Sequence, residues 1–301
     1  MVELKVWARA VRAPFLLLSL VLVPVGVGVA WWEAGAFSLA RSLWTLTGLL
    51  LAHISVNVLN EYSDYQSGID LNTVKTPFSG GSGALPAGLL RPVAVYRLGL
   101  AALLGAFGIG LYLAILAGPL LLILIFAGGL MICFYTTHLA RWGVGELVAG
   151  LGLGSLPVLG AYFVQTGYFS LSAVVAALAP GFLTANLLLL NEFPDAEADR
   201  RGHRVHLVIV LGRRRAAYVY IMLVLAAYLA VAGGVAARLM PIWCLLALLT
   251  LPLTWRAGRT ALKHHDDLSK LTPGLAANVQ TILGTDLLLA LGYFLGGALA
   301  T

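Results

Sequence analysis

The chain of 301 residues is unusually apolar. Hydrophobic residues make up 60% of it, only 11% are charged, and the mean hydropathy is +0.92, whereas soluble domains carry about 25% charged residues. This composition excludes a soluble globular enzyme, a disordered chain and a surface nucleic-acid binder, although the net charge is +6. It predicts instead a polytopic membrane protein built from apolar helices of about 20 residues each.

Stretches without charged residues define the expected spans in chain order. Two long stretches, 98–137 and 147–191, are each long enough for two helices, with turns at Gly118-Pro119 and near residues 165–167. The other stretches are single spans, and the alternation typical of a β-barrel is absent. The predicted fold is therefore all-α, a bundle of nine transmembrane helices, whose single spans cover 14–32, 42–60, 216–237, 239–255 and 273–298.

The basic residues predict how this bundle is oriented. If the N-terminus and the even-numbered loops share one face, all of the 19 Lys and Arg residues except Arg41 and Arg238 lie on that face. Basic loops are retained on the cytoplasmic side of a membrane. We therefore expect a cell-membrane protein with a cytoplasmic N-terminus and a C-terminus on the opposite face. The positive net charge then needs no nucleic-acid partner.

Seven of the 13 acidic residues fall in two short segments that resemble each other. Residues 59–64 read LNEYSD, and 190–195 read LNEFPD. Each copy ends an even-numbered span, and four spans separate the copies, which favours a parallel internal repeat. We expect one transmembrane domain, 1–301, with pseudo-repeat halves of about 1–140 and 141–270 and a ninth helix at about 273–298.

The polar residues of both segments lie at helical spacing. Asn60 and Asp64 are one turn apart, and Asn191, Asp195 and Asp199 follow the same i, i+4 pattern. Carboxylates on one face repel one another unless cations neutralise them. Oxygen-only ligand sets favour Mg²⁺, which commonly brings substrate phosphates with it. The alternative is that these acids are ordinary polar helix ends at the membrane interface.

At these residues the chain resembles the UbiA superfamily of intramembrane prenyltransferases, which carries an Asn-x3-Asp motif after its second helix and an Asp-x3-Asp motif after its sixth. The span count, motif positions and orientation agree along essentially the whole chain. Three strings are most similar to the menaquinone-type branch, which prenylates a 1,4-dihydroxy-2-naphthoate. They are NEYSDY at 60–65, followed by Gly68 and Asp70, then FSGGSG at 78–83 and YFVQTG at 162–167.

The resemblance implies a Mg²⁺-dependent transfer of a polyprenyl group from an isoprenyl diphosphate to an aromatic ring, inside the bilayer. With a naphthoate acceptor, as in menaquinone biosynthesis, the acceptor carboxylate leaves as CO₂. Asp64, Asp195 and Asp199 would be catalytic. Two Mg²⁺ ions bridged by the diphosphate would be held on one side by Asn60, Asp64 and Asp70, and on the other by Asn191, Asp195 and Asp199.

The resemblance also implies basic contacts to the diphosphate and an aromatic residue near the reacting carbon. The expected diphosphate contacts are Arg12, Lys75, Arg141 and Arg204, although each basic residue also fits a headgroup anchor on the cytoplasmic face. In residues 202–206 the sequence reads GHRVH, which departs from the Gly-Lys-Arg-Thr-like family pattern and leaves His203, Arg204 and His206 as alternatives for one contact. Tyr135 would either stabilise an allylic cation through its ring or belong to an interfacial aromatic belt.

Other functions stay open at this stage. Within the superfamily, the acceptor could be 4-hydroxybenzoate, homogentisate or a porphyrin-type ring in place of a naphthoate. A cation-coupled transporter is an alternative from another class, but the repeat is parallel and the acids gather at one face, away from the midplane. A CDP-alcohol phosphotransferase would need an Asp-Gly and Ala-Arg element that is not found here.

Overall fold

A computed structural model describes residues 2–71, 73, 76–135 and 138–300. Within these residues every regular element is helical, and seven helical segments are long and apolar enough to cross a membrane. They are η1 with α2 (Ala13–Leu16, Leu17–Ala34), α3 (Leu39–Gln66), α4 (Pro92–Ala117), α6 to α7 (Gly145–Gly150, η4 Leu151–Ser155, Leu156–Thr166), α8 (Leu171–Arg201), α10 (Arg213–Ala236) and α12 (Leu268–Ala300).

The two remaining expected spans also fall on helical segments. One is α5 (Leu121–Tyr135), an apolar helix of 15 residues. The other combines a 3₁₀ stretch, η5 (Ile242–Thr250), with α11 (Leu251–His264). The all-helical fold class is confirmed for the described residues, and seven spans satisfy the length and hydropathy that a membrane crossing requires.

Both predicted turns inside the long apolar stretches are confirmed. Helix α4 ends at Ala117, before Gly118 with φ +128° and then Pro119. Helix α7 ends at Thr166, and Gly167 follows in the left-handed region with φ +81°. Glycine reaches these backbone angles without the steric cost that a Cβ atom brings.

Two helices extend beyond the ends of the predicted apolar spans. Helix α3 runs six residues past Asn60 to Gln66, and α8 runs ten residues past Asn191 to Arg201, through Pro194. The lack of an N–H at Pro194 therefore does not end the helix here. As a consequence the acidic segments are not loops but the last turns of two long helices, so their carboxylates are held on rigid elements.

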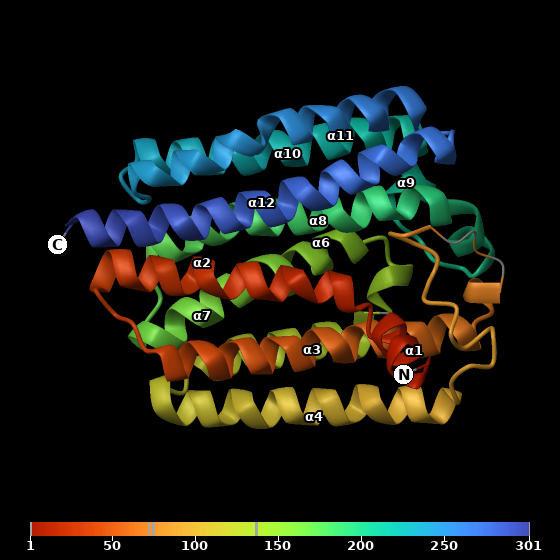
Figure 1. The fold of residues 1–301 in the computed structure, drawn as a ribbon, viewed down its shortest axis with the longest axis horizontal. Coiled ribbons are helices and arrows are strands. Elements are labelled where there is room, and N and C mark those ends of the chain that lie inside the picture. The colour runs from red at the N-terminus through yellow and green to blue at the C-terminus, as the bar shows by residue number, and fades with distance from the viewer. Residues whose placement is uncertain (1, 72, 74–75, 136–137, 301) are drawn as a thin grey trace.

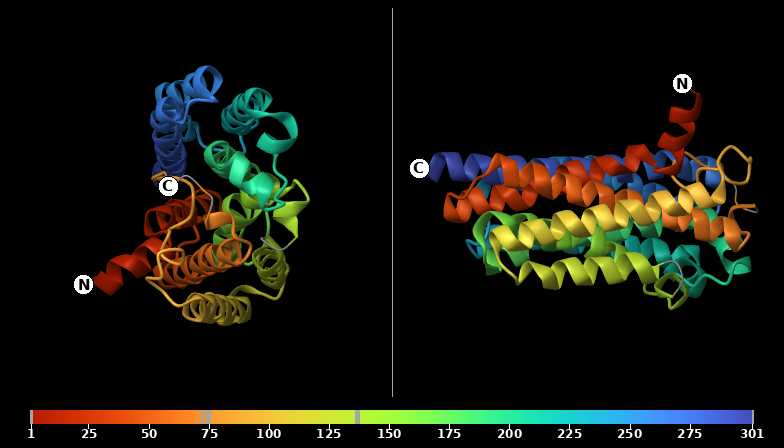
Figure 2. Two further views of the ribbon diagram at one scale, coloured as in Figure 1. Left: turned by 90° about the vertical axis from the view of Figure 1, so that its right-hand side faces the viewer. Right: turned by 90° about the horizontal axis from the view of Figure 1, so that it is seen from below.

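Small residues bring the helices into close contact. A Cβ atom on Gly154 of η4 would lie 2.6 Å from the carbonyl oxygen of Pro180 in α8, and one on Gly26 of α2 would lie 2.8 Å from the Cβ of Ala161 in α7. Such positions admit only glycine, and they are typical of packing between membrane helices. The end-on view in Figure 2 shows the resulting bundle, with α8 near its centre, and buried residues of α2 and α8 belong to one core cluster.

The short elements gather at one end of the bundle. Figure 1 shows α1 (Val2–Ala10), the connection between α3 and α4, and α9 (Leu207–Leu211) together on the right, where α3 and α8 also end. The connection includes η2 (Ile69–Leu71), and a further short element, η3 (Leu139–Arg141), follows α5. The C-terminus of the chain lies at the opposite end. The two acidic segments therefore face each other at the end where the connections can cover them.

Candidate functional site

The ends of α3 and α8 line one cavity of about 390 Å³, a size typical of small-molecule sites. Both acidic segments contribute to its polar end. Asn60 and Asp64 come from α3, and Asn191, Asp195 and Asp199 from α8, while Asp70 enters from η2. All six residues that the sequence assigns to metal binding are therefore brought together at one end of the same cavity.

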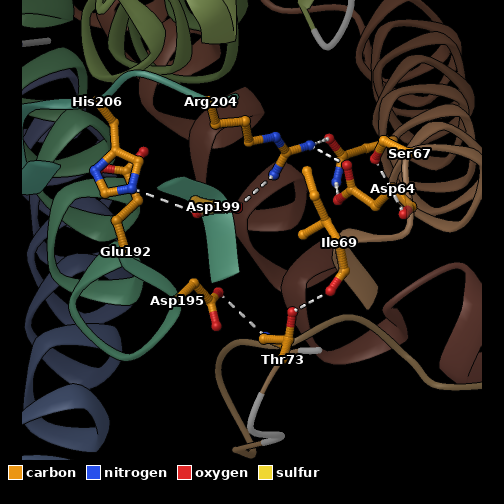
Figure 3. Close-up of polar contacts among 11 residues, drawn as sticks. Asp64, Ser67, Ile69, Thr73, Glu192, Asp195, Asp199, Arg204 and His206 are labelled. Atoms are coloured by element: carbon orange, nitrogen blue, oxygen red, sulfur yellow. Dashed lines mark hydrogen bonds and ion pairs between the residues drawn. The ribbon is translucent and has the colours of Figure 1, made fainter. Parts of the chain in front are cut away.

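Arg204 connects the two acidic segments. It follows the end of α8, and its guanidinium forms an ion pair with Asp64 and donates a hydrogen bond to Asn60 Oδ1 at 3.0 Å. A second nitrogen of the same group lies 3.5 Å from Asp199 Oδ1. Asn60 Nδ2 in turn donates to Asp64 Oδ2 at 2.9 Å. Figure 3 shows the guanidinium between the Asp64 and Asp199 side chains.

The geometry also separates two of the three alternatives for the basic contact, Arg204 and His203. Arg204 lines the cavity with a side chain that is only 16% exposed, whereas His203 is exposed and stands in the turn with φ +59°. Burial lowers the pKa of Arg204, but the carboxylates of Asp64 and Asp199 outweigh it, so that the pKa lies above its ordinary value. Arg204 is therefore a permanent positive charge at the centre of the polar end.

The connection between α3 and α4 covers the polar end with backbone N–H groups. The N–H of Gly80 donates to Asp195 Oδ2 at 3.2 Å, and the N–H of Ser82 donates to Glu61 Oε2 at 2.9 Å. The Ser82 hydroxyl donates to the other oxygen of Glu61. Glu61 is fully buried. It therefore fixes residues 80–83 against α3, and the glycine-rich string acts as a tethered cover over the carboxylates.

Gly81 permits a very close approach to Asp70. Its φ is +67°, and a Cβ atom there would lie 2.6 Å and 2.7 Å from the two carboxylate oxygens of Asp70. Asp70 itself is 5% exposed. Burial, followed by the negative charges of Asp64 and Glu61, raises the pKa of Asp70 to about 7. This carboxylate therefore lies over the site although α3 has already ended at Gln66.

The remaining predicted residues lie at different distances from the cavity. Arg12, with φ +52° before η1, and Tyr135, at the end of α5, both line it. Arg141 at the end of η3 has an exposed side chain and is not among the lining residues of the described chain. Lys75 lies outside the described residues.

The other part of the cavity is apolar and long. Its wall follows α3 back from Asp64 to Thr45, a distance of about 28 Å at roughly 1.5 Å per helical residue. Faces of α4, α5 and α7 complete it, with residues such as Leu113, Leu124 and Val164. Among its few polar groups is His53, whose Nδ1 lies 3.0 Å from the Ser19 hydroxyl. The cavity thus combines a charged end with an extended apolar chamber.

The charges at the polar end favour cation binding. Among the described lining residues, five carboxylates (Asp64, Asp70, Glu192, Asp195 and Asp199) face only two guanidinium groups, those of Arg12 and Arg204. Three buried oxygens that point to this region have no hydrogen-bond partner in the described structure: Asp70 Oδ2, Asn191 Oδ1 and Asp195 Oδ1. Since buried polar atoms are normally paired, this oxygen-rich set fits hard divalent cations such as Mg²⁺.

Sequence reasoning did not bring together three neighbours of the site. Glu192 and His206 line the cavity, and Glu146 lies against them from the first turn of α6. Glu192 had a signal, because it is the second acid of the repeated string. His206 was only one of three alternatives for a basic contact, and nothing in the sequence brings Glu146 close to either residue.

The fold and the site together define a class, a helical membrane protein whose cavity joins an acidic, cation-binding end to a long apolar chamber. Residues 21–279 match the UbiA prenyltransferase family. The chain belongs to this family and is a prenyltransferase, which confirms the resemblance inferred from the two acidic segments. A similar curated protein is the 1,4-dihydroxy-2-naphthoate octaprenyltransferase of Escherichia coli (strain K12), which is 27% identical, with 96% of this chain and 95% of that protein covered.

Solved structures share the fold. The apo structure of a UbiA homolog from Aeropyrum pernix K1 superimposes with a TM-score of 0.71 at 20% identity, covering 91% of this chain and 97% of that one. A UbiA homolog from Archaeoglobus fulgidus, bound to DMAPP and Mg²⁺, gives a TM-score of 0.63 at 15% identity, covering 94% and 98%. The structural similarity therefore extends over almost the whole chain.

Proposed function

We propose that this chain transfers a polyprenyl group from an isoprenyl diphosphate to 1,4-dihydroxy-2-naphthoate. The observation that carries the proposal is the cavity itself, which extends about 28 Å along α3, with two Asn-x3-Asp sets and Arg204 at one end and an apolar chamber along the rest. A diphosphate fits the first part and an isoprenoid chain the second. The naphthoate acceptor is supported by the names of relatives that cover most of the chain.

Mg²⁺ fits the donor set at the polar end. In the proposal one ion is held by Asn60, Asp64 and Asp70, and a second by Asn191, Asp195 and Asp199. When bound, the ions supply positive charge that stabilises the departing diphosphate. The unpaired oxygens of Asp70, Asn191 and Asp195 are the observation that supports this assignment.

The chain's own residues position the diphosphate. Arg204 is held by Asp64 and Asp199, so its guanidinium is fixed where it can bind phosphate oxygens in a bidentate manner. Arg12 lines the same end, and Lys75 is proposed as a further contact. Arg141 is given no role, because its exposed side chain does not line the cavity.

The apolar chamber protects the reacting carbon. In the proposed reaction the C–O bond between prenyl carbon and diphosphate breaks, which leaves an allylic cation beside the ring of Tyr135, where a cation–π contact is worth about 0.5–2 kcal/mol. The acceptor ring carbon attacks it, a C–C bond forms, and the carboxylate leaves as CO₂. The chamber excludes the water that would quench the cation. Diphosphate is the second product.

The membrane arrangement is part of the proposal. We place nine spans in the bilayer, counting α5 and the η5–α11 segment, with halves 1–140 and 141–270 related by a parallel repeat and a ninth span near 273–298. The basic residues favour a cytoplasmic N-terminus. The polar end of the cavity then opens to the cytoplasm, where soluble acceptors and Mg²⁺ are available, and the C-terminus lies on the opposite face.

A product assay tests the acceptor. Purified protein with Mg²⁺ and a long-chain prenyl diphosphate is offered dihydroxynaphthoate, 4-hydroxybenzoate, homogentisate and a porphyrin, and the products are weighed by mass spectrometry. The expected product has the mass of the naphthoate plus the prenyl group minus CO₂. Prenylation of another acceptor alone would overturn the naphthoate assignment. Absence of transfer to all four would overturn the proposed reaction.

Substitution of the aspartates tests the site. We expect Asp64→Ala and Asp195→Ala each to lower turnover at least about 100-fold, because each removes a carboxylate ligand of a proposed Mg²⁺ ion whose charge stabilises the departing diphosphate. Glu197→Ala is the matched control, since Glu197 is an exposed acid on α8 whose nearest basic partner is Arg200 at 3.6 Å. Folding of each variant is checked by its melting temperature in detergent. Normal turnover in both aspartate variants would show that these carboxylates do not bind the reacting groups.

A further inference from the structure

A second cluster of potential ligands lies beside the proposed diphosphate site. Glu146 comes from the first turn of α6, Glu192 from α8, and His206 from the residue before α9. All three are buried, with exposed fractions of 3%, 8% and 4%. One potential ligand atom from each lies within 4.8 Å of those of the other two. Figure 3 shows His206 and Glu192 next to each other, on the far side of Asp199 from Asp64.

Four side-chain atoms of this cluster have no hydrogen-bond partner in the described structure. These atoms are Glu146 Oε2, Glu192 Oε2 and both ring nitrogens of His206. His206 Nδ1 lies 3.6 Å from Glu192 Oε2, which is too long for a hydrogen bond. This distance is the one expected between two atoms that each lie about 2.0–2.2 Å from one shared metal ion. Two buried carboxylates beside a histidine with an unpaired nitrogen need a positive charge between them.

Neighbouring groups position two of these side chains. The backbone N–H of Leu207 donates to Glu146 Oε1 at 2.7 Å, which fixes that carboxylate. His206 Nε2 lies 3.4 Å from Asp199 Oδ2, close to it but not hydrogen-bonded. A ligating histidine commonly directs its second nitrogen to a carboxylate and leaves the first nitrogen for the metal. In the cluster Nε2 lies on the side of Asp199 and Nδ1 on the side of Glu192.

We propose that Glu146, Glu192 and His206 bind one divalent transition-metal ion, separate from the Mg²⁺ sites of the proposed reaction. One imidazole nitrogen and two carboxylates are donors that suit Zn²⁺, Mn²⁺ or Fe²⁺, whereas Mg²⁺ prefers oxygen ligands. The ion neutralises the two glutamates and, through His206, orients Asp199. The alternative occupant of the space is a proton shared by the two carboxylates. The proposal does not depend on the proposed reaction.

Manganese alone serves as the probe, since its electron-spin-echo spectrum reports directly coordinated nitrogen. Tag-free, chelator-stripped full-length protein in detergent is titrated with Mn²⁺ in the absence of any diphosphate. We expect a bound ion whose spectrum carries ¹⁴N modulation from a single imidazole. The modulation disappears in His206→Gln. It persists in Asp195→Asn, because the donors of the proposed Mg²⁺ sites are oxygen atoms only, and it also persists in the surface control Glu197→Gln.

A second variant protects the test against misfolding. Glu146→Gln keeps an oxygen that can accept from Leu207 N–H but removes one negative charge, so we expect the dissociation constant for Mn²⁺ to rise at least about 10-fold. Melting temperatures establish that each variant is folded. Bound Mn²⁺ without nitrogen modulation in the wild-type protein overturns the proposal, as does unchanged modulation in His206→Gln. Failure of the wild-type protein to bind Mn²⁺ at all favours the shared proton and also overturns it.

Discussion

Replacing Gly81 by alanine tests how closely the cover over the site must approach Asp70. The new Cβ atom would lie 2.6 Å from Asp70 Oδ1 and 2.7 Å from Oδ2. An ordinary contact is longer by roughly 1 Å, so the carboxylate has to move by about that amount. The backbone at φ +67° also costs an L-residue about 1–2 kcal/mol. The variant therefore combines backbone strain with displacement of a proposed metal ligand.

Gly88→Ala is the matched control for this prediction. Gly88 has φ +66°, and a Cβ atom there meets nothing within 4 Å, so it carries the same backbone strain without the clash. We expect both variants to lose about 1–2 kcal/mol of stability. Only Gly81→Ala should lose turnover, by about 100-fold, because a displacement near 1 Å in a catalytic site has that effect.

The assay measures melting temperature in detergent, together with kcat and the Mg²⁺ concentration that gives half-maximal rate. Gly81→Ala should require more Mg²⁺, whereas Gly88→Ala should keep the wild-type requirement. If the two variants have equal rates and equal Mg²⁺ dependence, the contact between Gly81 and Asp70 has no part in catalysis, and Asp70 should be removed from the proposed ligand set.

Arg204→Gln should destabilise the protein by about 3–5 kcal/mol, since it leaves the buried carboxylates without their partner. Arg204→Lys should be more stable than Arg204→Gln but at least about 10-fold less active than the wild-type protein, because a point charge cannot replace the guanidinium fork. His203→Asn, at an exposed position, should change the free energy of unfolding by less than about 0.5 kcal/mol. A large loss of stability would contradict the placement of His203 outside the site. Gly154→Ala should cost about 1–3 kcal/mol by overpacking η4 against α8. Gly233→Ala in α10, with open space around it, should instead gain up to about 1 kcal/mol, and equal thermal shifts in these two variants would argue against the close helix approach.

The repeated acidic strings carried most of the functional prediction. A helix places Asn60 beside Asp64 and Asn191 beside Asp195 whatever the tertiary structure is, so local periodicity alone predicts two polar faces. The turns at Gly118 and Gly167 were also predictable, because glycine and proline restrict the backbone locally. The full lengths of α3 and α8 were not predictable from hydrophobicity. The last turns of both helices are polar, so the apolar pattern ends before the helix does.

Contacts between distant segments depended on the fold. Nothing local indicates that Arg204, and not His203 or His206, reaches Asp64 across the cavity, since this requires the end of α8 to lie opposite the end of α3. The same holds for the Gly80 N–H that donates to Asp195, 115 residues away along the chain. Arg141 illustrates the converse, because its position in the sequence is suitable but η3 leaves its side chain exposed.

By itself the sequence determined that this chain is a helical membrane protein with two acidic helix ends, because composition and helical spacing are properties of short segments. The tertiary structure decided which of those groups share a cavity and which cations balance them. It also brought Glu146 from α6 against Glu192 and His206, a cluster assembled from three separate segments. Such a cluster forms only when segments far apart in the chain pack together. Packing buries the three groups and removes the water that would otherwise solvate each of them separately.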